Sequence, residues 1–394
     1  MFKRNFIGML GVNKCFNILV LFVSVFLVAR VFFVTGFDIT AVALFILLEV
    51  VGIFVFYFIA SAICAKVKPI WMVRVATVFL CLFILLTVLW ADGLYSHFML
   101  FGALWGVVQG LYWGGMNFLI TQIFKQNKTL TYFTVNAILG AVIGILFPFT
   151  FGFAIDYASW VVAAIAVLAV GIVQVVFSFL VKTERVENQK FQMVAYFRAL
   201  KDKGHLRPAF TYWAVMVLNG FTYTRAALTS ILIIMAFGTN TSIGVFGSVF
   251  AVVGIAFLFA YKVSKRNLKE PMFWLAAVLP ILVSVGLFFL VSPLTVIIFN
   301  AGIAFWGVVD VETGSERMKA VQHYNGEGYF LEGHVFYEWA LVVGRSLSCL
   351  LLVVVWLLGS PPILFAAAIS FTVLTFLARA IVIFIWKRKY TDRL

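Results

Sequence analysis

The chain has 394 residues, of which 64% are hydrophobic and only 11% are charged, and its mean hydropathy is +1.11. A soluble domain carries roughly 25% charged residues because it needs a polar shell, so this composition excludes a soluble enzyme or binding protein. The net charge of +14 does not indicate nucleic-acid binding, because the basic residues fall in short segments between long apolar runs.

Twelve apolar runs, each near the ~20 residues that cross a bilayer, predict an all-α polytopic membrane protein. We place the spans at 16–36, 40–65, 70–91, 95–122, 130–153, 157–181, 209–237, 241–262, 271–291, 293–318, 330–357 and 361–386. Residues 1–14 are expected to form an amphipathic lead-in and not a cleaved signal. The predicted domains are a six-helix bundle over 1–181, a cytoplasmic linker over 182–208 and a second six-helix bundle over 209–394.

Lysine and arginine lie on one side of the predicted membrane. Only four of the 29 basic residues lie inside spans: Arg30, Arg225, Arg345 and Arg379. The loops on the opposite side have none, and three of those loops carry an acid: Asp38, Asp92 and Asp156. Because loops rich in Lys and Arg stay inside the cell, both termini are expected in the cytoplasm, with the spans in the plasma membrane.

The two halves of the chain repeat one another. The sequence Trp-Gly-Val-Val occurs at 105–108 and again at 306–309, and Gly144 has its counterpart in Gly344. Two related six-span halves predict pseudo-symmetric bundles with a substrate site near the midplane.

Local motifs lie in the fourth and fifth spans. Gly110-Leu111-Tyr112-Trp113 is followed by Asn117, and the next span carries Gly140, Gly144, Pro148 and Gly152 at intervals of four. With the two six-span halves and the central linker, these motifs resemble bacterial members of the major facilitator superfamily, especially exporters. The family's acidic and glycine-rich loop signature between helices 2 and 3 is largely lost here. The resemblance implies secondary transport by alternating access.

The glycine spacing also has a physical meaning. Gly140 and Gly144 share a helix face and allow close approach of another helix. Pro148 removes a backbone hydrogen bond and is expected to bend its helix. A gating or structural role is expected for these residues and for Gly344; a close-packed pair without a part in substrate contact is the simpler alternative.

Ionisable groups inside spans are costly unless they face protein or water. We predict an ion pair between Arg30 and Glu49, with proton coupling by Glu49 as the alternative. Arg225 lies near the midplane and is expected to bind an anionic group of the substrate or to balance a cavity carboxylate; a buried pair with a fixed helix partner is the alternative. Arg379 is expected to extend to the cytoplasmic interface.

The tenth and eleventh spans are the most polar. Glu338 is our first candidate for the proton carrier and Asp310 the second, because a carboxylate in a dry cavity titrates nearer to neutral pH. Arg345 shares the helix face of Glu338 and is a candidate for substrate binding. A gate or interfacial salt bridges are expected from the remaining polar residues: Glu312, Glu316, Arg317, Glu332 and His334.

The matching spans of the first half offer aromatic and amide groups for substrate contact: Gln109, Tyr112, Trp113, Asn117 and Asn136. No Gly-x-Ser-x-Gly, His-Glu-x-x-His or Walker motif is present, so we do not expect an enzyme, a metal site or a cofactor. The expected function is proton-coupled secondary transport of a small solute by a monomer in the lipid bilayer, with export preferred. The alternatives are proton-linked uptake of a sugar or organic anion, and a non-transporting sensor or membrane-embedded enzyme.

Overall fold

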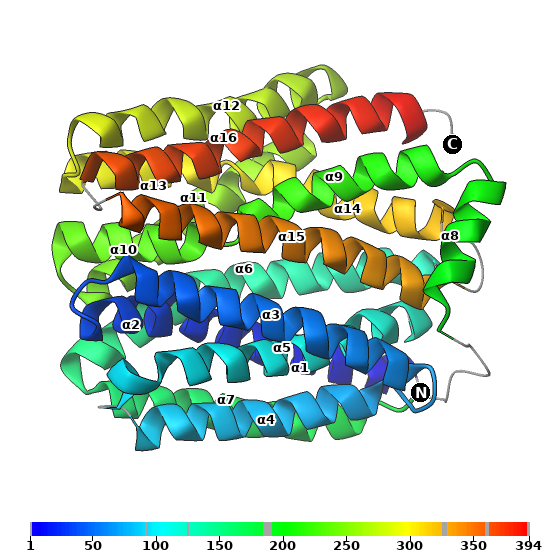
Figure 1. Ribbon diagram of the computed structural model, residues 1–394, viewed down its shortest axis with the longest axis horizontal. Helices are drawn as coiled ribbons and strands as arrows, with labels where there is room; N and C mark the ends of the chain where they lie inside the picture. The colour runs from blue at the N-terminus through cyan, green and yellow to red at the C-terminus, as the bar shows by residue number, and fades with distance from the viewer. Residues whose placement is uncertain are drawn as a thin grey trace. The chain divides into compact units, whose positions relative to one another are not determined.

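A computed structural model describes residues 2–90, 93–123, 126–183, 191–324, 329–358 and 362–391. All regular elements in these ranges are helices (Figure 1). Eleven helical segments in the described ranges are long and apolar enough to cross a membrane. The remaining predicted span is α5, Leu94–Ile123, a helix of 30 residues whose apolar stretches are interrupted by glycine and polar side chains. The predicted all-α fold with twelve spans is confirmed.

The chain divides into two compact units. Unit 1 contains Met1–Phe191 and Gly238–Ser248, and unit 2 contains Gln192–Phe237 and Val249–Leu394. Helix α11, Asn240–Val263, therefore begins in unit 1 and ends in unit 2.

Unit 1 is built from the helices before residue 191. These are α1 (Phe2–Leu21), η1 (Phe22–Leu27), α2 (Val28–Val34), α3 (Ile39–Cys64), α4 (Ile70–Leu89), α5, α6 (Gln126–Tyr157) and α7 (Trp160–Leu180). The first three form one uninterrupted run with a single wider π-turn at η1. The predicted lead-in over 1–14 is wrong: the first helix begins at Phe2, because Met9, Leu10 and Val12 are already buried where α1 packs against α6 and α7.

Unit 2 contains the remaining helices. These are α8 (Met193–Asp202), α9 (Leu206–Phe221), α10 (Arg225–Phe237), the larger part of α11, α12 (Arg266–Phe289), α13 (Pro293–Ala304), α14 (Gly307–Tyr324), α15 (Phe330–Leu357), α16 (Pro362–Trp386) and the π-turn η2 (Lys387–Thr391). Two spans that the sequence predicts as continuous are broken, one between α9 and α10 and the other between α13 and α14. The sequence also gave no indication of α8, a short amphipathic helix within the expected linker.

Glycines let helix backbones approach closely in both units. In α5 they recur every fourth residue at 102, 106, 110 and 114, and all four face α3. A methyl group on Gly110 would lie 2.8 Å from the Cβ atom of Phe56. In unit 2, a methyl group on Gly344 of α15 would overlap the carbonyl of Val217 in α9. Small residues at such spacing are the usual means by which helices associate in a bilayer.

Helix α6 continues through Pro148 to Tyr157 and packs on the first turns of α11 within unit 1. A side chain on Gly244 would overlap the Pro148 carbonyl, and the Ser248 hydroxyl donates to the Ile145 carbonyl at 2.5 Å. The Asp156 carboxylate accepts hydrogen bonds from the side-chain amide of Asn240 at 2.8 Å and from the Thr241 backbone N–H at 2.6 Å. Asp156 thereby satisfies an amide at the start of α11, where a negative charge is favourable.

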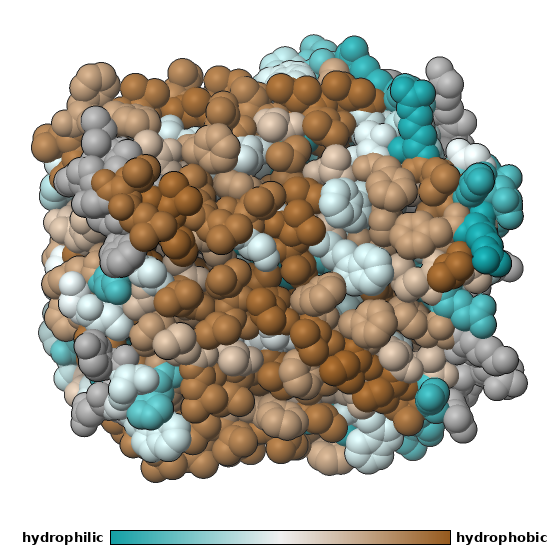
Figure 2. Space-filling model, viewed as in Figure 1, coloured by the Kyte–Doolittle hydropathy of each residue, from teal (hydrophilic) through white to brown (hydrophobic). Residues whose placement is uncertain are grey.

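Apolar side chains cover much of the visible helix surface, and hydrophilic ones gather where α8 lies (Figure 2). Large apolar residues are strongly exposed on helices of both units, among them Phe179, Phe259 and Leu282 at 63–66%. An exposed apolar surface of this kind is stable in lipid and not in water. The chain is an integral membrane protein with multiple spans.

Candidate functional site

The two helix breaks of unit 2 place polar side chains beside one another. Helix α9 ends at Phe221, where the Thr222 hydroxyl donates to the Asn219 carbonyl at 2.8 Å, and α10 begins at Arg225. Helix α13 ends at Ala304, two residues before Trp306. Interrupted helices recur at the solute sites of transporters, because irregular backbone at membrane depth is tolerated only inside protein or beside water.

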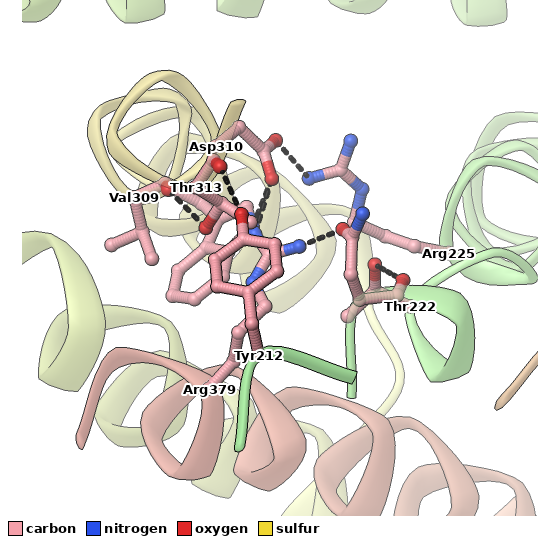
Figure 3. A network of polar contacts seen from close by, with 9 residues as sticks. Tyr212, Thr222, Arg225, Val309, Asp310, Thr313 and Arg379 are labelled. Atoms are coloured by element: carbon pink, nitrogen blue, oxygen red, sulfur yellow. Dashed lines mark hydrogen bonds and ion pairs between the residues drawn. The ribbon is translucent and has the colours of Figure 1, made fainter. Parts of the chain in front are cut away.

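Five side chains form what we call the Asp310 cluster: Asn219, Arg225, Trp306, Asp310 and Arg379. The Asp310 Oδ1 atom accepts hydrogen bonds from the Arg379 guanidinium and from the Trp306 indole, the latter at 3.1 Å. Its Oδ2 atom lies 4.0 Å from a guanidinium nitrogen of Arg225 (Figure 3). Arg379 also donates to the Asn219 side-chain oxygen, and its guanidinium carbon lies 4.6 Å from the centre of the Trp306 ring.

The members of the Asp310 cluster differ in exposure. The Arg379 side chain is fully buried, whereas those of Asp310 and Arg225 are 43% and 35% exposed. The cluster therefore has one buried cation, Arg379, and two charged side chains, Asp310 and Arg225, that solvent or a solute can reach.

A cavity of about 300 Å³ adjoins the cluster, lined by Met216, Asn219, Asp310, Thr313 and Gly314. The Tyr212 hydroxyl donates to the Thr313 carbonyl at 2.6 Å and joins α9 to α14 beside it (Figure 3). The volume is at the lower end of the range of small-molecule sites. Polar groups from α9 and α14 thus reach one cavity within unit 2.

The prediction for Arg379 is wrong. This arginine does not extend to the interface but points into unit 2, because it lies on the buried face of α16 with Phe376, Ala380 and Ile383. The sequence offered little to detect this, since the same span also contains exposed residues of similar hydropathy, such as Leu374 and Ile381.

Glu338 and Arg345 form a second ion pair in unit 2. The Arg345 guanidinium donates to the Glu338 carboxylate at 2.8 Å, and the two side chains are only 14% and 8% exposed, respectively. Arg345 also lies over the ring of Tyr223, in the break between α9 and α10, at 4.7 Å. The structure therefore brings together the two residues whose seven-residue spacing predicted a common face.

The other candidate gate residues lie apart from the cavity lining. Glu312 accepts from the Tyr261 hydroxyl at 2.7 Å and from the Lys387 ammonium at 2.6 Å. Glu332 accepts from the Gln192 backbone N–H at 2.7 Å, immediately before α8. Glu316 and His334 are buried, and the side chain of Arg317 lies outside the described residues.

In unit 1, Arg30 and Glu49 contact different groups. The Gln109 amide donates to the Glu49 carboxylate, whereas the Arg30 guanidinium lies 4.7 Å from the centre of the Trp160 ring. The Arg30–Glu49 ion pair stays a prediction. Glu49 lies against α5, because the four glycines of α5 at 102, 106, 110 and 114, which we call the glycine ladder, bring α3 and α5 together.

The candidate substrate residues of unit 1 are mostly packed against other side chains. Tyr112 is fully buried and stacks on Phe16 with 3.5 Å between ring centres, and Trp113 meets the same ring edge-on. The Asn117 amide donates to the Tyr57 hydroxyl at 3.1 Å. The Asn136 backbone carbonyl accepts from the ammonium of Lys14 at 2.7 Å.

The sequence predicts Lys14 outside the spans, at the end of the expected lead-in, but it is 91% buried between α1 and α6. Unit 1 therefore holds a buried charge that the sequence assigned to the membrane surface. No sequence signal separates Lys14 from the neighbouring basic residues Lys3 and Arg4, because the first apolar run begins only after it.

Charged and amide side chains within membrane helices, gathered at helix breaks beside a cavity, are the features of a membrane carrier for a small solute. The family model described as Major Facilitator Superfamily matches residues 10–313. The chain belongs to this superfamily: it is a multi-pass membrane transporter that moves a small-molecule substrate by secondary transport, and it is not an enzyme.

Solved transporter structures share this fold. A proton dependent oligopeptide (POT) family transporter aligns with a TM-score of 0.71 at 12% identity, over 95% of this chain and 99% of that one. The POT family transporter PepTSo aligns with a TM-score of 0.67 at 12% identity, over 99% of both chains. A bacterial homologue of the human lysosomal transporter Spinster, inward-facing and unoccupied, aligns with a TM-score of 0.63 at 10% identity, over 98% and 96% of the two chains. No curated protein matches the sequence.

Proposed function

We propose that this protein couples the transport of a small anionic solute to protons, with the Asp310 cluster as the solute and proton site of unit 2. One observation carries the proposal: a partly exposed carboxylate beside a cavity is held by two arginines. With Asp310 ionised, the two guanidinium groups leave a net positive charge at the cavity. Guanidinium groups bind carboxylate and phosphate oxygens through paired hydrogen bonds.

The arrangement provides a physical basis for coupling. Asp310 and an anionic solute compete for the same two guanidinium groups. Protonation of Asp310 removes its negative charge and leaves Arg225 and Arg379 to the solute. Proton and anion therefore favour one another's binding, which is the thermodynamic requirement for moving together when the binding site alternates between the two sides of the membrane.

This coupling favours uptake, since a cell whose proton gradient points inward would take up the anion with the proton. Export remains a second candidate, supported by the resemblance of the glycine and proline pattern in α6 to that of exporters. Two similar structures are of POT transporters, one of them described as proton dependent, but at 12% identity this likeness establishes the fold alone.

Two carboxylates are candidates for the proton carrier, and the geometry reverses the order that the sequence favours. Asp310 lines the cavity and is 43% exposed, whereas Glu338 is 8% exposed and directly paired with Arg345. A carrier of protons must be reached by water in at least one state. We therefore place Asp310 first and assign the Glu338–Arg345 pair to holding α15 against the break at Tyr223.

Flux in proteoliposomes tests the proposal. Benzoate, succinate and inorganic phosphate are screened by thermal stabilisation, and the stabilising anion is then followed as a radiolabel with a pH-sensitive dye inside the vesicles. We expect an imposed pH gradient to drive accumulation in the wild type. Asp310→Asn should still exchange the anion but not concentrate it, and Arg225→Gln should weaken its binding.

The matched control is Glu270→Gln, which removes an exposed carboxylate of α12 that does not line the cavity. It should transport like the wild type. Concentrative uptake by Asp310→Asn equal to that of the wild type would refute the coupling role of Asp310. Accumulation only when the gradient is reversed would favour export.

A further inference from the structure

We infer that Lys14 is an anion-binding residue of unit 1, and that its ammonium binds an oxyanion (a carboxylate or a phosphate) beside Asn136 and Gly140. The inference rests on the proposed function in that the transported solute is anionic. It adds a second cationic site, in the unit for which the sequence predicted only neutral groups for substrate contact.

Lys14 lies between two aromatic contacts that the run from α1 into η1 makes with α6. On one side, Phe6 meets Tyr132 edge-on with 6.2 Å between ring centres. On the other, Phe22 meets Phe151 at 5.4 Å. Both phenylalanines lie eight residues from Lys14, or about 12 Å along the helix. Aromatic contacts therefore lie on both sides of the buried charge along the first helical run.

The Lys14 ammonium has three hydrogen-bond donors, and one of them is used by the Asn136 carbonyl at 2.7 Å. In the described part of the chain, no carboxylate lies within ion-pair distance of it. A buried charge is costly unless an opposite charge compensates it, so the site lacks a negative group that a bound anion would supply.

Gly140 provides the space for this group. A Cβ atom at Gly140 would lie 3.3 Å from the Lys14 nitrogen, and no other atom of the described residues comes within 4 Å of it. Gly152 faces α11, whereas Gly140 leaves a notch over the lysine. Gly140 and Asn136 are partly exposed, so a solute can approach the ammonium from the side of α6.

A second reading is that Lys14 only joins α1 to α6 through its hydrogen bond. A glutamine at position 14 can still donate a hydrogen bond to the Asn136 carbonyl but carries no charge. A methionine there fills the space with neither a hydrogen-bond donor nor a charge. These two substitutions separate the readings, because replacing an uncompensated buried charge by an apolar side chain usually stabilises a protein.

The experiment titrates benzoate and inorganic phosphate, in separate arms, into the purified full-length protein by calorimetry and thermal unfolding. We expect Lys14→Gln to weaken binding of the preferred anion about tenfold to a hundredfold, the range for a charge-assisted hydrogen bond. Lys14→Met should raise the Tm without anion and abolish its stabilising effect. Lys66→Gln makes the same charge change at an exposed position of unit 1 and should bind like the wild type.

The inference would be overturned if Lys14→Gln bound the anion as tightly as the wild type. It would also be overturned if Lys14→Met had a lower Tm than the wild type without anion, or if neither anion stabilised the wild-type protein. The proposed function fails separately. If Arg225→Gln loses binding while Lys14→Gln keeps it, only the role of Lys14 is refuted. If Lys14→Gln loses binding but transport does not respond to a pH gradient, only the proton coupling is refuted.

Discussion

Arg379 joins three helices at one point because a guanidinium group carries five N–H donors in a plane. It donates from α16 to Asn219 of α9 and to Asp310 of α14, and it lies over the ring of Trp306. Lysine could not reproduce this, since its ammonium is a single point of charge. Arg379 is thus the side chain of the Asp310 cluster that is held in place by several contacts, whereas the more exposed Arg225 can change its partner.

Arg379→Met should therefore lower stability more than Arg225→Met. Removing one partner of a buried ion pair costs about 3–5 kcal/mol, and because Asp310 is partly exposed we expect the lower part of that range, about 3 kcal/mol. Thermal unfolding in detergent measures the loss. In a double-mutant cycle, Asp310→Asn should cost less in the Arg379→Met background than in the wild type. Strictly additive effects would show that the two side chains do not interact.

At single residues, the sequence predicted pairs that share a helix better than pairs that join two helices. Glu338 and Arg345 lie on one face because they are seven residues apart, and they form an ion pair. The partners of Arg379 and Lys14 come from other helices, and the packing of those helices depends on small residues that hydropathy does not resolve. The contact between Gln109 and Glu49 likewise joins two helices, since the glycines of α5 bring that helix against α3.

At the scale of elements, the pairing of α3 with α5 depends on the glycine ladder. A methyl group on Gly106 would overlap the Glu49 carbonyl and lie 2.8 Å from the Cα atom of Gly52. Gly106→Ala should therefore separate the helices and destabilise the protein by about 1–3 kcal/mol. Gly286→Ala is the matched control in α12, where the nearest atom would be 3.9 Å away. It should be neutral or stabilising, because alanine favours helix over glycine by about 1 kcal/mol. Equal unfolding temperatures for the two variants would show that the close packing at Gly106 does not stabilise the pairing of α3 with α5.

Helix α8 gives a pH-dependent prediction. Burial raises the pKa of the Tyr196 phenol, which packs near Phe336 with 6.0 Å between ring centres. The docked helix thus favours the neutral phenol. Docking should be complete below the ordinary tyrosine pKa of about 10 and should weaken as the pH rises above it. A spin label at Val194→Cys, an exposed position of α8, should become more mobile at alkaline pH. Tyr196→Phe should abolish this change, and a label that responds equally in both proteins would exclude Tyr196 as its cause.

The sequence predicted where the spans lie but not where they break. Hydropathy averages over a whole span, and neither break contains a proline within it: Thr222, Tyr223 and Thr224 separate α9 from α10, and Phe305 and Trp306 separate α13 from α14. The contacts that accompany these breaks come from elsewhere in unit 2. Arg345 lies over Tyr223, and Arg379 lies over Trp306. These interactions join distant parts of the chain and leave no local pattern.

At the scale of the whole molecule, the distribution of charge implies an orientation in the membrane. Arg379 and Lys14 are now assigned to the interior of their units, which leaves the remaining surface lysines and arginines in the segments predicted as cytoplasmic. Removing Lys14 from the count does not weaken the asymmetry, because the opposite loops still have no basic residue. Both termini, α8 and the loop around Lys66 are therefore expected on the cytoplasmic side of the plasma membrane.

Labelling of single cysteines in intact cells tests this orientation. The native Cys15, Cys64, Cys81 and Cys349 are first replaced by alanine. Ala158→Cys then introduces a thiol in the exposed turn between α6 and α7, and Lys66→Cys introduces one in the exposed turn between α3 and α4. A membrane-impermeant maleimide should label only the first in intact cells and both after permeabilisation, because positively charged loops are retained inside during insertion. Labelling of Lys66→Cys in intact cells would show that the topology is inverted.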